Sequence, residues 1–246
     1  MSKIATGPID ALERDVLAAA KKQLGKNFVS LIAIGSRATQ DHLPDSDLDA
    51  YLFVRDLKIT ALDFSALERQ YGVRIGVSVK LLAALKHGQC NFEVESEMIF
   101  CDSSRIGMRR GQTRTIGGRN LVETLPPLKD LLQRDIIGEL QQDYDFAVRK
   151  DSRANVFKRE PRRQVGVIIA LCQNLLAAKG VYVRKVELPE AMRKYHPRFR
   201  VIGLLRRALK RRQHWPSLHI DRKQRAEIQQ DAKNFLAAYG KYVFAL

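Results

Sequence analysis

Apolar positions in the first half of the chain follow two different spacings. In residues 8–24 they recur at intervals of three to four residues and Gly25 follows as a stop signal, which predicts a helix. The runs 28–34 and 48–54 are short and mostly apolar, as is typical of buried strands. The same patterns predict four further elements: a helix at 60–71, a strand at 73–79, a helix at 80–88 and a short strand near 97–101.

The second half of the chain has helical periodicity and few strand signals. Beyond Pro126 and Pro127 five helices are expected: 128–149, 161–179, 187–195, 199–213 and 221–243. Between the halves, residues 102–119 are rich in Arg, Gly, Ser and Thr and include the pair Gly117 and Gly118, which predicts a flexible connection. We therefore expect an α/β (α+β) domain with a mixed sheet at residues 1–119, followed by an all-α, basic helical bundle at residues 120–246.

Positive charge is concentrated in the predicted helical half. The chain has 246 residues and a net charge of +16. Residues 1–124 contain 17 Lys and Arg against 15 Asp and Glu, whereas residues 125–246 contain 26 against 12. Such a bias favours a polyanionic partner, because clustered Lys and Arg neutralise phosphates and release counterions. A basic but merely solvated helical surface is the alternative interpretation.

Membrane and disulfide signals are weak in this sequence. There is no run of 18 or more apolar residues, and the first residues lack the layout of a secretory signal, so we expect a cytoplasmic protein with no membrane partner. Cys90, Cys101 and Cys172 are odd in number and widely spaced, which suggests neither a disulfide framework nor a zinc site.

Candidate chemistry lies between the first two predicted strands. Gly35 permits close backbone approach and Ser36 adds a hydroxyl, so this turn suits triphosphate oxygens, with Arg37 as an additional contact. Asp47 and Asp49 stand two residues apart at the entry to a strand, so both carboxylates point to one face and can bind Mg²⁺ together. Each feature alone is typical of an ordinary turn or helix cap. Their joint position, after one strand and at the start of the next, favours an active site.

This arrangement resembles a known family. A Gly-Ser pair, ten intervening residues and Asp-x-Asp, with a serine directly before the first Asp, resembles the signature of nucleotidyltransferases related to DNA polymerase β. The resemblance covers about residues 28–105, in a family that includes minimal nucleotidyltransferases, antibiotic adenylyltransferases and nucleotidyltransferases of toxin–antitoxin systems. It implies Mg²⁺-dependent transfer of a nucleoside monophosphate (NMP) from an NTP to a hydroxyl. Gly35 and Ser36 would hold the triphosphate, and Asp47 and Asp49 the metal.

One departure from the family concerns a third carboxylate, which members commonly carry on a later strand. Here that strand is predicted at 73–79 and contains no acid, because Gly76 or Ser78 occupies the expected face. Three acids further along the chain are candidates to substitute for it: Glu93, Glu95 and Glu97. Without a substitute, catalysis is expected to be weakened or lost while nucleotide binding remains.

The charge distribution ranks the possible acceptors of the nucleotide. RNA, and a tRNA end in particular, suits the basic half best, whereas a cationic aminoglycoside needs an acidic wall. Seven residues of the two densest basic clusters are candidate phosphate contacts: Lys158, Arg159, Arg162, Arg163, Arg207, Lys210 and Arg211. The sequence therefore predicts a nucleotidyltransferase acting on RNA, either as a toxin-like enzyme with a protein partner or as a processing enzyme. A catalytically impaired, antitoxin-like regulator and an antibiotic adenylyltransferase are the alternatives.

Overall fold

The computed structural model describes residues 8–58, 61–83, 89–94, 97–102, 110–124, 133–148, 157, 160–215 and 220–246. The chain divides into two compact units, Ser2–Asp130 and Leu131–Leu246, and each is described by itself. The domain boundary that the sequence predicts, between residues 119 and 120, is not tested by this division and stays a prediction. No helix in the described ranges is both long and apolar enough to cross a bilayer.

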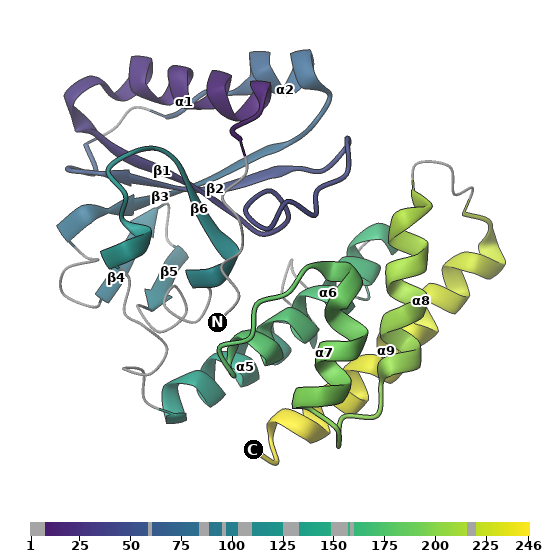
Figure 1. Ribbon diagram of the computed structural model, residues 1–246. Coiled ribbons are helices and arrows are strands. Elements are labelled where there is room, and N and C mark those ends of the chain that lie inside the picture. The colour runs from purple at the N-terminus through teal and green to yellow at the C-terminus, as the bar shows by residue number, and fades with distance from the viewer. Residues whose placement is uncertain are drawn as a thin grey trace. The chain divides into compact units, whose positions relative to one another are not determined.

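A mixed four-stranded sheet forms the centre of the first unit (Figure 1). Its described elements are α1 (Ala11–Leu24), β1 (Phe28–Ile34), β2 (Leu48–Val54), α2 (Ser65–Tyr71), β3 (Ile75–Leu81), β4 (Gln89–Val94), β5 (Glu97–Asp102) and β6 (Thr113–Gly118), with short 3₁₀ turns at Gly25–Asn27, Arg110–Gln112 and Val122–Thr124. The strand order is β3-β2-β1-β6. β1 is antiparallel to both β2 and β6, while β2 and β3 are parallel. β4 and β5 form a separate antiparallel pair.

Helices α1 and α2 cover one face of this sheet, as Figure 1 shows. Leu12 and Val16 of α1 pack there against Leu31 of β1 and Leu52 of β2. The apolar runs of β1 and β2 therefore form strands because both are central and buried, as their continuous hydrophobic pattern predicted.

Three segments of the first unit differ from the sequence-based expectations. The predicted connection at 102–119 is wrong in part, because residues 113–118 form β6 and pair with β1. Gly117 is needed there because the side chain of Leu17 packs where a Cβ would stand. The predicted helix at 80–88 is also wrong at its start, since β3 continues to Leu81, and residues 84–88 lie outside the described part of the chain. β4 was not predicted, although its sequence QCNFEV alternates polar residues with Cys, Phe and Val in the two-residue period of a strand.

The second unit is helical, as expected. It contains α5 (Gln133–Val148), α6 (Pro161–Ala177), α7 (Leu188–Tyr195), α8 (Ile202–Gln213) and α9 (Arg222–Val243), and a 3₁₀ turn at Lys185–Glu187. α6 is the central helix and contacts each of the other four. Its side chains Ile168, Cys172 and Leu175 are fully or almost fully buried. The apolar spacing of the sequence thus predicted the five helices of this unit.

His196, at the end of α7, is buried in the helical core. Its Nε2 lies 3.0 Å from the carbonyl oxygen of Leu175, and its Nδ1 lies 2.9 Å from the hydroxyl of Tyr242. The carbonyl can only accept, so Nε2 carries the proton and Nδ1 accepts from Tyr242 in the neutral ring. Burial lowers the pKa of His196 below its ordinary value of 6.5, although the bond to Leu175 acts in the opposite direction.

We expect this histidine to make the stability of the protein depend on pH. A lowered pKa in the folded state means that the unfolded chain binds a proton more readily. The contribution is therefore fully present above about pH 6.5 and is lost as the pH falls below it. Thermal unfolding at pH 7.5 and 5.5 measures the effect. The variant His196→Gln keeps a donor for Leu175 but cannot titrate, so its melting temperature is expected to fall less between the two pH values.

Candidate active site

The turn after β1 has a backbone conformation that requires glycine. Gly35 has φ of +65°, which residues with a Cβ rarely adopt. The backbone N–H of Thr39 donates to the carbonyl of Gly35 at 3.1 Å, and that of Asp41 to the carbonyl of Ser36 at 2.8 Å, so the chain folds back tightly. No atom lies within 4 Å of the position that a Cβ of Gly35 would take. The turn therefore leaves open space directly beside its backbone.

The pairing of β1 with β2 brings this turn close to the two aspartates. Ile34, the last residue of β1, lies opposite Asp49 in the antiparallel register. Asp47 and Asp49 are both exposed, while Leu48 between them is buried. The two carboxylates therefore share the exposed face at the start of β2, next to the residues that follow Ile34, as the spacing predicted.

Arg37, expected from the sequence to contact a nucleotide, is almost completely buried. Its Nη1 donates to Oδ2 of Asp10 at 2.5 Å, its Nη2 to the carbonyl of Ser46 at 3.1 Å and its Nε to the carbonyl of Asp47 at 3.3 Å. The guanidinium thus joins the start of α1 to the loop that carries the first aspartate. These bonds suit Arg37 to hold the backbone at Asp47 in place, and a direct contact of Arg37 with a nucleotide stays a prediction.

A second buried arginine supports the same loop. Nη2 of Arg114, on β6, donates to Oε1 of Glu13 at 2.6 Å and lies 3.4 Å from the carbonyl of Arg37. Glu13 also accepts from the backbone of Asp10, and Asp10 accepts from the backbone of Glu13, which forms a capping box at the start of α1. Asp10, Glu13 and Arg114 were not identified from the sequence as part of the site. The spacing Asp-x-x-Glu before an apolar helix was the available signal.

The position opposite Asp49 on β3 is Gly76, so this strand places no carboxylate opposite Asp49. A Cβ at Gly76 would lie 2.7 Å from Oδ1 of Asp49 and 3.1 Å from Nη2 of Arg74. Arg74 itself lies 3.8 Å from Oδ1 of Asp49. Of the acids considered as substitutes, Glu93 and Glu97 belong to β4 and β5, where only the backbone is described, and Glu95 lies outside the described residues.

The donor set at the start of β2 fits a hard divalent cation. Two exposed carboxylates on one face supply oxygen ligands, and Mg²⁺ usually binds one or two carboxylates together with substrate phosphates and water. Among the described residues there is no group of three or more His, Cys, Asp or Glu side chains that would form a complete protein cage. Asp47 and Asp49 would therefore supply two of the oxygen ligands of Mg²⁺, and phosphate oxygens and water suit the remaining positions.

Two of the basic residues predicted to contact nucleic acid join helices to one another. Nε and Nη2 of Arg207 donate to the two carboxylate oxygens of Asp231 at 3.0 and 2.8 Å, and Nη1 of Arg211 donates to Asp231 at 2.5 Å. Burial alone would raise the pKa of Asp231, but these hydrogen bonds lower it below its ordinary value. Arg207 and Arg211 therefore join α8 to α9.

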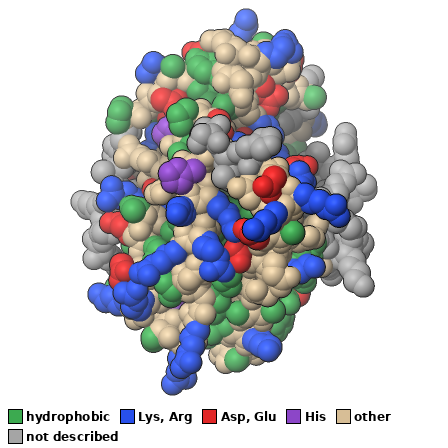
Figure 2. Space-filling model, turned by 90° about the vertical axis from the view of Figure 1, so that its right-hand side faces the viewer, with side chains coloured by type: hydrophobic (Ala, Val, Ile, Leu, Met, Phe, Trp, Pro, Cys, Tyr) green, Lys and Arg blue, Asp and Glu red, His purple; other side chains and the backbone are tan. Residues whose placement is uncertain are grey.

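The remaining predicted contacts differ in exposure. Arg162, Arg163 and Lys210 are exposed on α6 and α8. Lys158 and Arg159 lie outside the described residues. Figure 2 shows Lys and Arg side chains, with Asp and Glu among them, on one face of the protein. The helical unit thus retains exposed positive charge in addition to the arginines used between helices.

Comparison with known proteins finds a similar fold. No protein-family model matches the chain, and no curated protein matches its sequence. The spectinomycin adenyltransferase AAD(9) from Enterococcus faecialis, solved with ATP and spectinomycin, superposes with a TM-score of 0.58. The two sequences are 14% identical, and the match covers 93% of this chain and 98% of the other. This chain therefore has the fold of a nucleotidyltransferase, with an α/β unit followed by a helical one.

Proposed function

We propose that this protein is a Mg²⁺-dependent nucleotidyltransferase that transfers NMP from an NTP to a hydroxyl group. The proposal depends on one observation above all: the β1–β2 pairing puts the turn at Gly35 and Ser36 beside the exposed carboxylates of Asp47 and Asp49. A phosphate-binding turn next to two cation ligands suits phosphoryl-type transfer, where the protein mainly positions the reactants. The fold shared with an enzyme solved with ATP supports the same class of reaction.

In the proposed reaction the acceptor hydroxyl attacks the α-phosphorus of the NTP. A new bond forms between the acceptor oxygen and phosphorus, the bond to the β-phosphate bridging oxygen breaks, and pyrophosphate leaves with that electron pair. Backbone amides at Gly35 and Ser36 would hold the triphosphate, and Asp47 and Asp49 would hold Mg²⁺, which stabilises the departing charge. Since Gly76 supplies no base, the proton of the hydroxyl would pass to water or to an ionised carboxylate on another segment.

RNA is our first candidate for the acceptor. Residues 125–246 contain 26 Lys and Arg against 12 Asp and Glu, and Arg162, Arg163 and Lys210 are exposed there. Exposed cations on one helical unit suit the phosphate backbone of RNA. A spectinomycin-like antibiotic is the second candidate, because the similarity to the spectinomycin adenyltransferase extends over both units.

Incubation of the protein with each labelled NTP and Mg²⁺ distinguishes the acceptors. Separate reactions contain total RNA, total protein or spectinomycin, and the labelled products are then separated by size. Label on RNA is the expected result, and its dependence on one NTP identifies the donor nucleotide. Label on spectinomycin would replace RNA with the second candidate, and label on protein would redirect the search to a protein acceptor.

Absence of transfer has a separate meaning. If no acceptor is labelled although Mg²⁺–NTP binds, the nucleotidyltransferase proposal is wrong and a nucleotide-binding regulator takes its place. Failure of Mg²⁺–NTP to bind would contradict the proposed site itself.

A further inference from the structure

We propose that Arg74 is a phosphate-binding residue of the nucleotide site, seated beside Asp49 by the absence of a side chain at Gly76. This inference rests on the proposed function, because it assigns a ligand group to the same site. Gly76 lies opposite Asp49 on β3, and the guanidinium of Arg74 lies beside the place that a side chain of Gly76 would take.

The backbone of Arg74 is fixed from two sides. The backbone N–H of Leu48, between the two aspartates, donates to the carbonyl of Arg74 at 3.0 Å. Oε1 of Glu68, from α2, accepts from the backbone N–H of Ile75 at 2.8 Å. These bonds hold the turn before β3 against the start of β2. The side chain of Arg74 therefore begins at a fixed point next to the candidate metal ligands.

The side chain of Arg74, in contrast, is held only loosely. Its Nη2 lies 3.8 Å from Oδ1 of Asp49, and the two side chains are 54% and 52% exposed. An exposed ion pair at this distance contributes little to stability, so Arg74 can leave Asp49 without a large penalty. A divalent cation bound by Asp49 would repel the guanidinium, whereas the phosphates that accompany the cation would attract it. Arginine is suited to that role because its planar fork donates two bonds to one phosphate.

Gly76 provides the space for this arrangement. A Cβ there would come within 2.7 Å of Oδ1 of Asp49 and within 3.1 Å of Nη2 of Arg74. Any larger residue must therefore displace the carboxylate or the guanidinium. The glycine thus leaves room for both the carboxylate of Asp49 and the guanidinium of Arg74.

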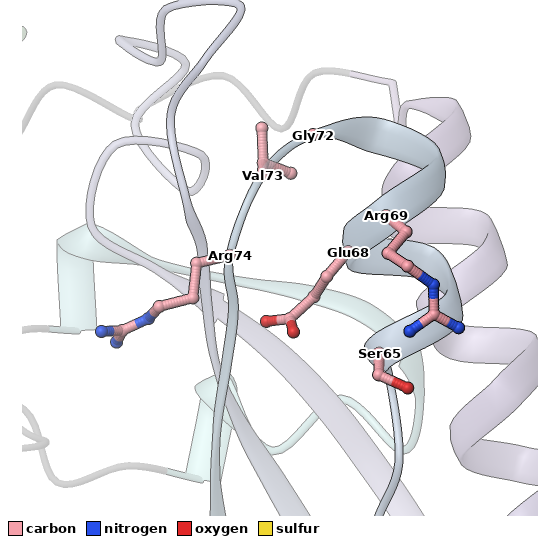
Figure 3. Close-up of a pocket in the computed structure, with 6 residues that line it drawn as sticks. All are labelled: Ser65, Glu68, Arg69, Gly72, Val73 and Arg74. Carbon is pink, nitrogen blue, oxygen red and sulfur yellow. The ribbon is translucent and has the colours of Figure 1, made fainter.

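A shallow depression beside this turn offers a matched control residue. It is lined by Ser65, Glu68, Arg69, Gly72, Val73 and Arg74. Figure 3 shows that Arg74 and Arg69 point to opposite sides, with Glu68 directed toward β3 between them. Arg69 is exposed and has the same charge as Arg74, but it belongs to α2. Replacing Arg69 removes an equal charge from the same depression without touching the neighbourhood of Asp49.

Binding of Mg²⁺–ATP and Mg²⁺–AMP to the full-length protein, measured by titration calorimetry, tests the proposal without any acceptor. Arg74→Gln is expected to weaken Mg²⁺–ATP binding about tenfold, as loss of a charge-assisted bond implies, and to leave AMP binding unchanged. Arg69→Gln should bind both as the unaltered protein does. Unchanged ATP affinity in Arg74→Gln would overturn the proposal. So would tighter binding, because Arg74 would then only compete with the cation.

A second variant tests the space at Gly76. Gly76→Ala is expected to weaken Mg²⁺–ATP binding about as much as Arg74→Gln, while its melting temperature stays the same or rises, since alanine suits a strand better than glycine. Gly166→Ala on α6, where a Cβ meets open space, is the matched control. Full ATP affinity in Gly76→Ala would contradict the role given to the glycine. Failure of the unaltered protein to bind Mg²⁺–ATP would instead overturn the proposed function, and this inference with it.

Discussion

Replacement of Asp49 by Asn is expected to lower the rate of NMP transfer about a thousandfold. The change removes the negative charge of a candidate Mg²⁺ ligand and keeps its shape. Loss of one group that stabilises a transition-state charge commonly costs two to three orders of magnitude, or about 4 kcal/mol in the barrier at the upper end. Asp47→Asn is expected to act similarly, because both carboxylates are exposed at the start of β2. Turnover of labelled NTP by each variant gives the measurement.

A change of the same kind outside the candidate site serves as the control. Asp56 follows the other end of β2, where it accepts a hydrogen bond from the backbone N–H of Lys58 at 3.0 Å. Asn can accept the same bond, so Asp56→Asn should transfer NMP at the normal rate. Normal transfer by the double variant of Asp47 and Asp49 would refute the proposed site. A thousandfold loss in Asp56→Asn as well would point to a general effect on folding.

The second large effect is expected from the buried ion pair of Glu13 and Arg114. Their side chains are only 2% and 6% exposed, and Nη2 and Oε1 are 2.6 Å apart. Glu13→Gln leaves the guanidinium buried without its counter-charge. Removal of one partner of such a pair typically destabilises a protein by about 3–5 kcal/mol. Urea denaturation followed by circular dichroism measures the loss in the free energy of unfolding.

Two further variants separate the ion pair from a general effect of the mutation. In the double variant Glu13→Leu, Arg114→Met no unpaired charge remains, so stability should recover to within about 1 kcal/mol, the usual cost of a lost helix cap. Glu190→Gln alters an exposed pair with Arg193 on α7 and should change stability by less than about 0.5 kcal/mol. If Glu13→Gln is no more destabilising than Glu190→Gln, the buried pair does not support the loop in the way proposed here.

Elements with strong apolar patterns were predictable from the sequence. β1, β2 and the five helices of the second unit all lie where the hydrophobic spacing predicted them. A buried strand has a continuous apolar run, and a helix with one buried face has apolar residues every three to four positions. β6 has neither pattern. Its sequence TRTIGG has one large apolar residue, Ile116, and the strand forms because its backbone pairs with β1.

Some residues of the candidate site could likewise be grouped from the sequence, whereas the contacts of others could not be predicted. Gly35, Ser36, Asp47 and Asp49 could be grouped from the sequence, since a turn and the next strand entry are close along the chain. The partners of Arg37 could not, because its side chain was equally suited to a phosphate in solution and to Asp10 in the interior. The same limit applied to the basic helices, where nothing in the sequence indicated that Arg207 bonds to Asp231, 24 residues away.

The sequence by itself determined β1, β2 and the five helices of the second unit, the turn that needs a glycine and the spacing of two carboxylates at one strand entry. These are local properties, set by side-chain periodicity and backbone conformation. The tertiary structure alone decided which charges are buried and which remain available to a ligand. The pairing of β2 with β3 brought Arg74 and Gly76 beside Asp49, because strand register joins residues that are distant along the chain.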